Sequence, residues 1–159
     1  MSDLAAFLFP VALVALVVIA IARALSPPRA KRICKEFGLD PKTHKLLGDD
    51  LGQKRGRIFL RADGVVGVPD AVFRDTAHDS LVIGEAKSRR FRGHIKDYER
   101  FQLILYMGAS RRKFRNASVA GVFRFGCGST IAMPFDEAVY RELIALIPRY
   151  KAALSARPK

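Results

Sequence analysis

Residues 64–88 read GVVGVPDAVFRDTAHDSLVIGEAKS and contain two apolar runs, Val65–Phe73 and Leu81–Ala86. Alternating side chains along each run are typical of a β-strand that packs one face on a core. Asp63-Gly64 is a hairpin signal before the first run, and the polar segment Arg74–Ser80 is typical of a turn between the two. The stretch therefore predicts two neighbouring strands.

Each predicted strand carries an acid where another apolar residue would be expected. The alternation places Asp70 on the same face as the valines that flank it, and it places Glu85 beside Lys87 on one face of the second strand. Two carboxylates that converge from adjacent strands form a hard-oxygen site suited to Mg²⁺. The lysine adds a cation where a phosphate would lie. This combination indicates cleavage of phosphodiesters.

The flanking sequence predicts a mixed α/β domain around these strands. Residues 39–53 are polar, and the sequence assigns no element to them. The other expected elements are a short basic helix at Arg29–Phe37, a strand at Arg57–Ala62, a helix from about Ile95 to Met107, strands at Val119–Phe125 and Ser129–Met133, and a closing amphipathic helix from Phe135 to about Leu154.

The chain of 159 residues has a formal net charge of +13, which indicates an anionic partner, either nucleic acid or an anionic membrane surface. An arginine-rich loop directly follows Lys87 and contains Arg89, Arg90 and Arg92. These side chains are expected to hold backbone phosphates of DNA. The alternatives are a solvated basic face and contact with lipid headgroups.

The N-terminal residues predict a membrane segment. Leu4–Ala22 has no charged residue, and at ~1.5 Å per residue it just crosses a ~30 Å hydrocarbon core. Lysine and arginine follow this segment but do not precede it, so the positive-inside rule predicts a single-pass protein of the inner, cytoplasmic membrane with later residues in the cytoplasm. A cleaved signal peptide is the alternative, because Ala22-Arg23-Ala24 is a loose cleavage site.

Three short stretches together resemble the PD-(D/E)XK nuclease superfamily, and within it the RecB-like branch. They are Val68-Pro69-Asp70, Glu85-Ala86-Lys87 and Gln102-Leu103-Ile104-Leu105-Tyr106. Each is weak alone, but the order of the acids and the helix with Gln-x-x-x-Tyr after them match the family pattern. The resemblance implies an α/β, restriction-endonuclease-like core, which is a mixed central sheet flanked by helices, here preceded by one transmembrane helix.

The resemblance also implies a role for each matched residue. Asp70 and Glu85 would hold Mg²⁺, with Mn²⁺ as the alternative, together with the backbone carbonyl of Ala86. Lys87 would help to position or activate the attacking water and would stabilise charge. The expected catalytic residues are thus Asp70, Glu85 and Lys87, and the expected nucleic-acid-binding residues are Gln102, Tyr106, Arg89, Arg90 and Arg92.

The sequence departs from the family pattern in two respects. Many members add an acid or a histidine from the region of the first helix, and the candidates here are Glu36, His44, Asp49 and Asp50. An iron–sulfur cluster held by four cysteines is not expected, because Cys34 and Cys127 are the only cysteines. The number of metal ions therefore stays open.

These observations predict a membrane-anchored, metal-dependent DNA nuclease that hydrolyses phosphodiester bonds on the cytoplasmic side. The expected partners are DNA and, through residues 4–25, the membrane, and the absence of a Walker sequence predicts no nucleotide cofactor. The alternatives are a non-catalytic DNA-binding and tethering membrane protein on the same fold, an RNase, and a membrane protein with a basic lipid-binding domain. The expected divisions are 1–25 for the anchor, 26–56 for the linker and first helix region, and 57–159 for the nuclease-like domain.

Overall fold

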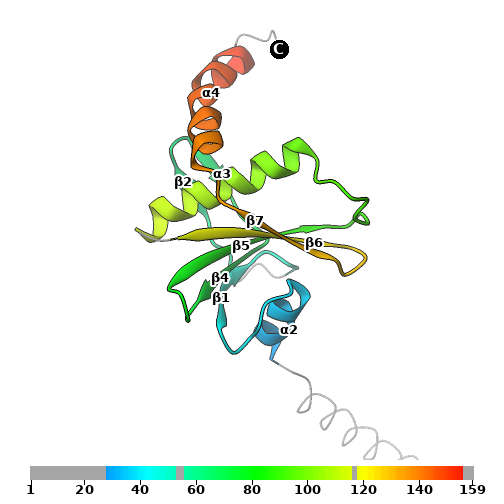
Figure 1. Ribbon diagram of the computed structural model, residues 1–159. Coiled ribbons are helices and arrows are strands. Elements are labelled where there is room, and N and C mark those ends of the chain that lie inside the picture. Colours follow the sequence, from blue (N-terminus) through cyan, green and yellow to red (C-terminus); the bar gives the residue numbers. More distant parts are fainter. Residues whose placement is uncertain (1–27, 53–55, 116–117, 156–159) are drawn as a thin grey trace, which may run out of the picture.

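The computed structural model describes residues 28–52, 56–115 and 118–155, and within them a mixed α/β fold (Figure 1). A five-stranded sheet lies at the centre, with a separate two-stranded hairpin and helices around it. In chain order the elements are α2 (Arg29–Glu36), β1 (His44–Asp49), β2 (Leu60–Ala62), β3 (Val65–Gly67), β4 (Ala71–Asp75), β5 (Ser80–Lys87), α3 (Asp97–Phe114), β6 (Val119–Phe125), β7 (Thr130–Pro134) and α4 (Glu137–Ser155).

The central sheet has the strand order β1-β4-β5-β6-β7. The neighbours pair antiparallel except β5 and β6, which run parallel with Glu85 opposite Phe123. A parallel pair needs a long crossover connection, and α3 supplies it. The expected mixed central sheet flanked by helices is therefore present.

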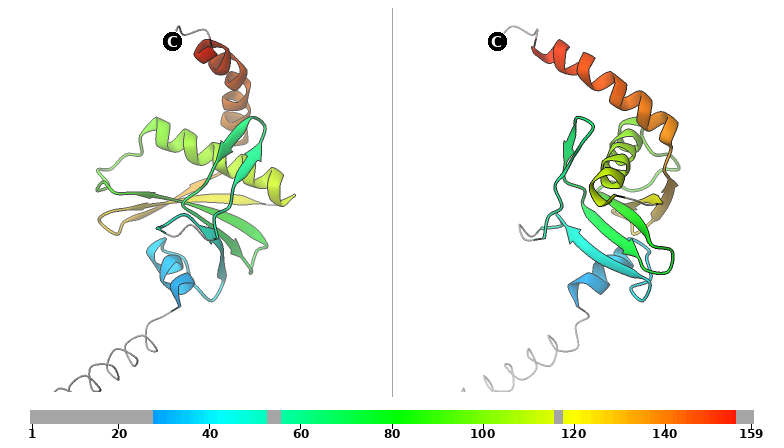
Figure 2. Two further views of the ribbon diagram at one scale, coloured as in Figure 1. Left: turned by 180° about the vertical axis from the view of Figure 1, so that it is seen from behind. Right: turned by 90° about the vertical axis from the view of Figure 1, so that its left-hand side faces the viewer.

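The two faces of the sheet are covered by different helices, α3 on one side and α2 on the other (Figure 2). Alternation along β5 sends Leu81 and Ile83 into the core under α3, whereas Val82 packs with α2. At Gly84 the ring of Phe37, the residue directly after α2, comes so close that a Cβ would lie 2.7 Å from it. Glu85, one residue further along β5, therefore belongs to the α3 face.

The predicted strand Val65–Phe73 is in fact two strands of different sheets. β3 pairs with β2 in the hairpin, and β4 pairs with β1 and β5 in the central sheet. The break lies at Pro69, which is almost completely buried and has no backbone N–H to donate to a strand ladder. As a result Asp70 stands at the start of β4, next to the end of β5.

The unassigned segment of residues 39–53 supplies the edge strand β1, which pairs antiparallel with β4. The sequence of β1 shows no regular alternation of polar and apolar residues, because its register with β4 shifts between Leu46 and Gly48. The predicted helix near Ile95–Met107 begins at Asp97 and continues to Phe114, since Ala109 and Ser110 still lie buried in the core.

The expectation of a transmembrane helix requires correction. Among residues 28–52, 56–115 and 118–155, no helix is both long and apolar enough to cross a bilayer. α2 has only eight residues, and α3 carries charged side chains at both of its ends. Leu4–Ala22, on which the expectation was based, lies outside the described residues. The fold class with a membrane-spanning helix and the single-pass inner-membrane location are thus not supported.

Candidate active site

The two predicted metal-binding carboxylates lie at one end of the β4–β5 pair. The register places Ala71 opposite Gly84, so Asp70 reaches the end of β5 at which Glu85 stands. Asp70 Oδ2 accepts a hydrogen bond of 2.7 Å from the backbone N–H of Ala86. The Glu85 side chain is only 6% exposed. Two acids of opposite strands thus converge on a largely enclosed site.

Lys87 and Gln102 complete this polar group on the α3 face of the sheet. Lys87 Nζ donates to Glu85 Oε1 over 2.9 Å and to Gln102 Oε1 over 3.3 Å. The bond to Lys87 satisfies the Gln102 amide oxygen. It explains why a half-buried polar side chain stands in an otherwise apolar stretch of α3. One cluster is thus formed by Asp70 just before β4, Glu85 and Lys87 of β5, and Gln102 of α3.

The environment raises the pKa of both carboxyl groups. For Asp70 the main cause is desolvation, opposed by the Ala86 hydrogen bond and the charge of Lys87. For Glu85 desolvation again dominates, and the negative charge of Asp70 raises its pKa further. Two carboxylates in a dry site repel one another, so a further cation between them would lower the free energy of the charged pair.

One oxygen of Glu85 has no partner. Within the described residues, Glu85 Oε2 is buried and has no partner at hydrogen-bond distance and angle, whereas Oε1 is paired with Lys87. The Gln102 side chain lies close enough to lower the pKa of Glu85, but its amide makes no hydrogen bond of good geometry to Oε2. A buried charged oxygen without a partner is costly, and it is a ligand of the kind that Mg²⁺ prefers. The described segments contain no group of three or more His, Cys, Asp and Glu side chains suited to a metal ion. Mg²⁺ is commonly held by one or two carboxylates and waters, so Asp70 and Glu85 fit it.

Tyr106 lies one turn after Gln102 on α3 and points toward the hairpin rather than toward the carboxylates. Its ring lies against Gly67, where an added Cβ would come within 2.5 Å of the ring. The absence of a side chain at Gly67 therefore allows the tyrosine to pack on β3. Gln102 and Tyr106 occupy the same face of α3, but only Gln102 touches Lys87.

The three predicted phosphate-binding arginines differ in their surroundings. Arg90 and Arg92 are exposed. Arg89 instead forms a two-pronged ion pair with the almost fully buried Glu99, with Nε–Oε1 at 3.0 Å and Nη2–Oε2 at 2.5 Å. Its guanidinium also lies over the ring of Phe125, 5.0 Å from the centroid. Arg89 thus connects the loop after β5 to Glu99 in the first turn of α3. The same helix carries Gln102 further along.

Replacing Arg89 with alanine is expected to lower the melting temperature by roughly 10 °C, because Glu99 would be left as a buried, unpaired charge. The matched control is Arg90→Ala, which removes an exposed arginine at the next position and should leave the melting temperature within about 2 °C. Circular dichroism melts of the full chain measure both variants. A similar melting temperature for Arg89→Ala and Arg90→Ala would contradict a structural role for the Arg89–Glu99 pair.

The four additional candidates for a metal ligand lie at different distances from the site. Asp50 is the nearest, because its backbone N–H donates to the Asp70 carbonyl and its charge raises the pKa of Asp70. Asp50 also forms an ion pair with Arg57. Asp49 is paired with Arg29 over 2.5 Å. The remaining candidates are Glu36, which is paired with Arg124, and His44, which lies beside Asp75.

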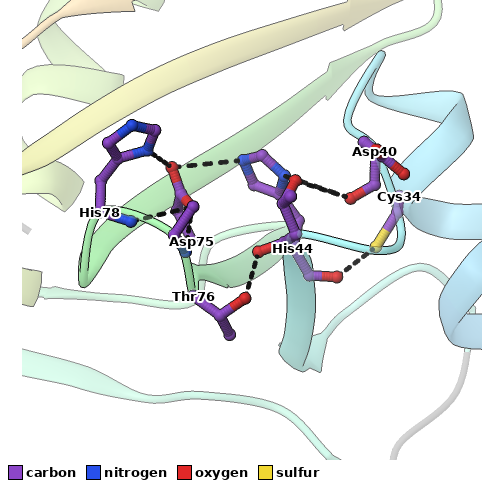
Figure 3. A network of polar contacts seen from close by, with 8 residues as sticks. Cys34, Asp40, His44, Asp75, Thr76 and His78 are labelled. Carbon is purple, nitrogen blue, oxygen red and sulfur yellow. Dashed lines mark hydrogen bonds and ion pairs between the residues drawn. The ribbon is translucent and has the colours of Figure 1, made fainter.

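A second polar cluster lies at the opposite end of β4, five residues and roughly 17 Å along the strand from Asp70 (Figure 3). The Asp75 carboxylate accepts from His78 Nδ1 over 2.7 Å and lies 4.0 Å from His44 Nε2. The hydrogen bond from His78 is the main cause that lowers the pKa of Asp75. Thr76 ties the same turn to β1 through the Thr43 carbonyl. These contacts fasten the β4–β5 turn to the edge strand.

Comparisons with known proteins give little guidance to the function. No family model matches the chain, and no curated protein matches it. Among solved structures, the chain described as "Crystal structure of SSO0001" is 17% identical, with a TM-score of 0.39, and the match covers 86% of this chain and 67% of that chain. A likeness this distant carries no argument about activity, so the function must be argued from the residues of the site.

Proposed function

We propose that this protein is a metal-dependent nuclease that hydrolyses phosphodiester bonds of DNA, with the chemistry at the cluster of Asp70, Glu85, Lys87 and Gln102. The observation that carries the proposal is the buried, unpartnered Glu85 Oε2 beside a second carboxylate. The resemblance of these residues to the PD-(D/E)XK superfamily also supports the proposal.

The carboxylates of Asp70 and Glu85 would hold Mg²⁺ or Mn²⁺, with the backbone carbonyl of Ala86 as a further proposed ligand. The bound ion would supply Lewis acidity toward the phosphate and would lower the pKa of water. Asp70 is kept in place by the Ala86 N–H, and Glu85 is kept in place by Lys87. Both acids are therefore oriented before any ion arrives.

Lys87 supplies the second positive charge of the site. Hydrolysis of a phosphodiester builds negative charge on the phosphate oxygens and on the leaving oxygen, and a preorganised ammonium group stabilises that charge. Gln102 accepts one of the three N–H groups of Lys87 and Glu85 accepts another, which restricts the ammonium to the site. The third N–H is left to face the phosphate or the attacking water.

The charge of the chain suits a polyanionic substrate. The net charge is +13, and the exposed Arg90 and Arg92 lie in the loop that leaves the end of β5. Contacts of this kind with phosphates carry no sequence information and weaken as salt rises. The nuclease is therefore expected to cut DNA without marked sequence preference.

The decisive experiment incubates the full chain with labelled DNA in Mg²⁺, Mn²⁺, Ca²⁺ or EDTA, with a matched RNA as the second substrate. Cleavage of DNA that requires Mg²⁺ or Mn²⁺ and stops in EDTA is the expected result. The Glu85→Gln variant, purified in parallel, distinguishes cleavage by this protein from cleavage by a contaminating nuclease. Binding of DNA without cleavage in any metal would exclude a nuclease, and cleavage confined to RNA would exclude the DNA assignment.

A further inference from the structure

A largely apolar groove opens directly beside the candidate active site, between α3, the β2–β3 hairpin and α4. It has a volume of about 560 Å³, which lies in the usual range for ligand pockets. Figure 2 shows the hairpin and α3 side by side, and in its right-hand view α4 passes above both. The lining residues that matter here are Val66, Tyr98, Gln102, Tyr106, Tyr150 and Lys151.

The lining is unusually rich in exposed aromatic side chains. Tyr98 is 62% exposed and Tyr150 is 66% exposed, although both are large apolar rings, and Val66 of the hairpin is 69% exposed. With Tyr106, three of the four tyrosines of the chain line this one groove. Exposed apolar surface gathered in a concave site marks a binding surface, because water is held there at a cost in free energy.

The groove is continuous with the polar cluster of the site. Gln102 lines the groove and accepts a hydrogen bond from Lys87, which in turn is bonded to Glu85. A substrate whose phosphate reaches Lys87 would therefore place its neighbouring nucleotides against the tyrosines. The surroundings are basic, since Lys151 lines the groove and the Lys96 ammonium lies 5.6 Å from the centre of the Tyr98 ring.

This chemistry fits an unpaired nucleic acid strand. Aromatic rings stack on the faces of bases, and cations beside them pair with the phosphates. In a duplex the faces of the bases are already stacked inside the helix, so they could not enter the groove. A neutral apolar partner would gain nothing from the lysines or from the overall positive charge.

We propose that the groove between α3, the hairpin and α4 binds the bases of a single DNA strand, so that the nuclease acts on single-stranded DNA or on single-stranded ends. This inference rests on the proposed nuclease function for the link to cleavage, but the binding itself can be measured without metal or catalysis. Tyr98 and Tyr150 are the stacking platforms, and Gln102 marks the point at which the groove meets the site.

The test measures binding of the full chain to a fluorescent thymidine oligonucleotide of about 12 nucleotides and to a duplex of equal length, both in EDTA. We expect the single strand to bind at least about tenfold more tightly than the duplex. The double variant Tyr98→Ala with Tyr150→Ala should lose about tenfold or more of the single-strand affinity, whereas Tyr→Phe at both positions should retain it, because stacking needs the ring and not the hydroxyl.

A matched control is Phe59→Ala, which removes another exposed aromatic ring, 62% exposed, that does not line the groove. It should leave the affinity unchanged. The chain has no tryptophan, so its intrinsic fluorescence comes from tyrosine. Quenching of that fluorescence by the oligonucleotide, reduced in the double alanine variant, would report stacking directly, and melting curves confirm that each variant is folded.

Equal affinity for single strand and duplex, with no loss in the double alanine variant, would overturn the inference. So would self-association of the parent chain that the double alanine variant abolishes without loss of DNA affinity, since a second copy would then occupy the groove. Tighter binding of an oligouridine strand would overturn the choice of DNA. Cleavage assays in Mg²⁺ distinguish the two proposals. If the parent chain cleaves DNA but shows no stacking on the tyrosines, only the proposal for the groove is refuted. If the oligonucleotide stacks on the tyrosines but is not cleaved, only the proposed nuclease function is refuted.

Discussion

Replacing Glu85 with glutamine is expected to reduce cleavage of DNA by more than about 10²-fold while the fold is retained. The substitution preserves the size of the side chain but removes the charge that would hold the metal. Because burial and Asp70 already disfavour that charge, the amide should fit the metal-free protein without loss of stability. Asp70→Asn should behave in the same way, since the second carboxylate is equally necessary.

Metal binding gives a readout for these variants that does not depend on cleavage. Mg²⁺ or Mn²⁺ stabilises a protein that binds it only in the folded state, by about 2.7 kcal/mol at a hundredfold excess over Kd. The parent chain should therefore melt at a higher temperature in Mn²⁺ than in EDTA, and Glu85→Gln should lose this difference. Glu142→Gln, which changes an exposed glutamate of α4, is the matched control and should keep both the shift and the activity. Parent-like cleavage by Glu85→Gln would contradict the assignment of the site.

Replacing Lys87 with alanine is expected to lower the rate of cleavage by about 10²–10³-fold for a different reason. The variant loses the cation that faces the phosphate but keeps both carboxylates. Its affinity for Mg²⁺ should therefore persist or rise, because a positive charge has been removed 2.9 Å from Glu85 Oε1. Affinity for the oligonucleotide should change little, since Arg90 and Arg92 remain.

Single-turnover cleavage, metal-induced thermal shifts and DNA binding measured on the same samples distinguish this pattern from a structural ion pair. Lys113→Ala, which removes an exposed lysine at the end of α3, is the control and should keep the parental rate. The cleavage rate of Gln102→Ala should lie between those of Lys87→Ala and Lys113→Ala, about tenfold below the parental rate. In this variant Lys87 keeps its bond to Glu85 but loses its contact with Gln102. A Lys87→Ala variant that loses metal binding together with cleavage would contradict the assignment of Lys87 as the cation that faces the phosphate.

Much of the arrangement follows from local sequence. The period-two alternation predicts that Asp70 shares a face with Val72 and that Glu85 shares a face with Lys87. Val72 packs in the core under α3, and Lys87 bonds both Glu85 and Gln102 of α3. β6 has the predicted bounds, Val119–Phe125, because its apolar run has clear polar limits. The contact between Lys87 and Gln102 agrees with the expectation that the helix after β5 packs beside it.

Other features depended on partners far away in the chain. Val66, Val68, Asp70 and Val72 fit a single alternating strand, and only the tertiary structure shows that the run divides at the buried Pro69 into β3 of the hairpin and β4 of the sheet. β1 has a weak pattern of its own and forms because β4 offers an unpaired edge. The phosphate-binding role expected of Arg89 stays a prediction, but its pairing with Glu99 was missed, because no local pattern indicates which arginine meets a buried acid.

The sequence by itself predicted α2, β5, α3, β6, β7 and α4, and it placed Glu85 and Lys87 on one face of β5, since strand alternation is a property of neighbouring residues. Only the tertiary structure decided that one oxygen of Glu85 is left unpartnered, and that tyrosines of α3 and α4 meet at one groove. Both facts depend on the packing of segments that are distant in the chain. The desolvation of a side chain and the electrostatic potential at it depend on every segment packed around it, so no single stretch of sequence specifies them.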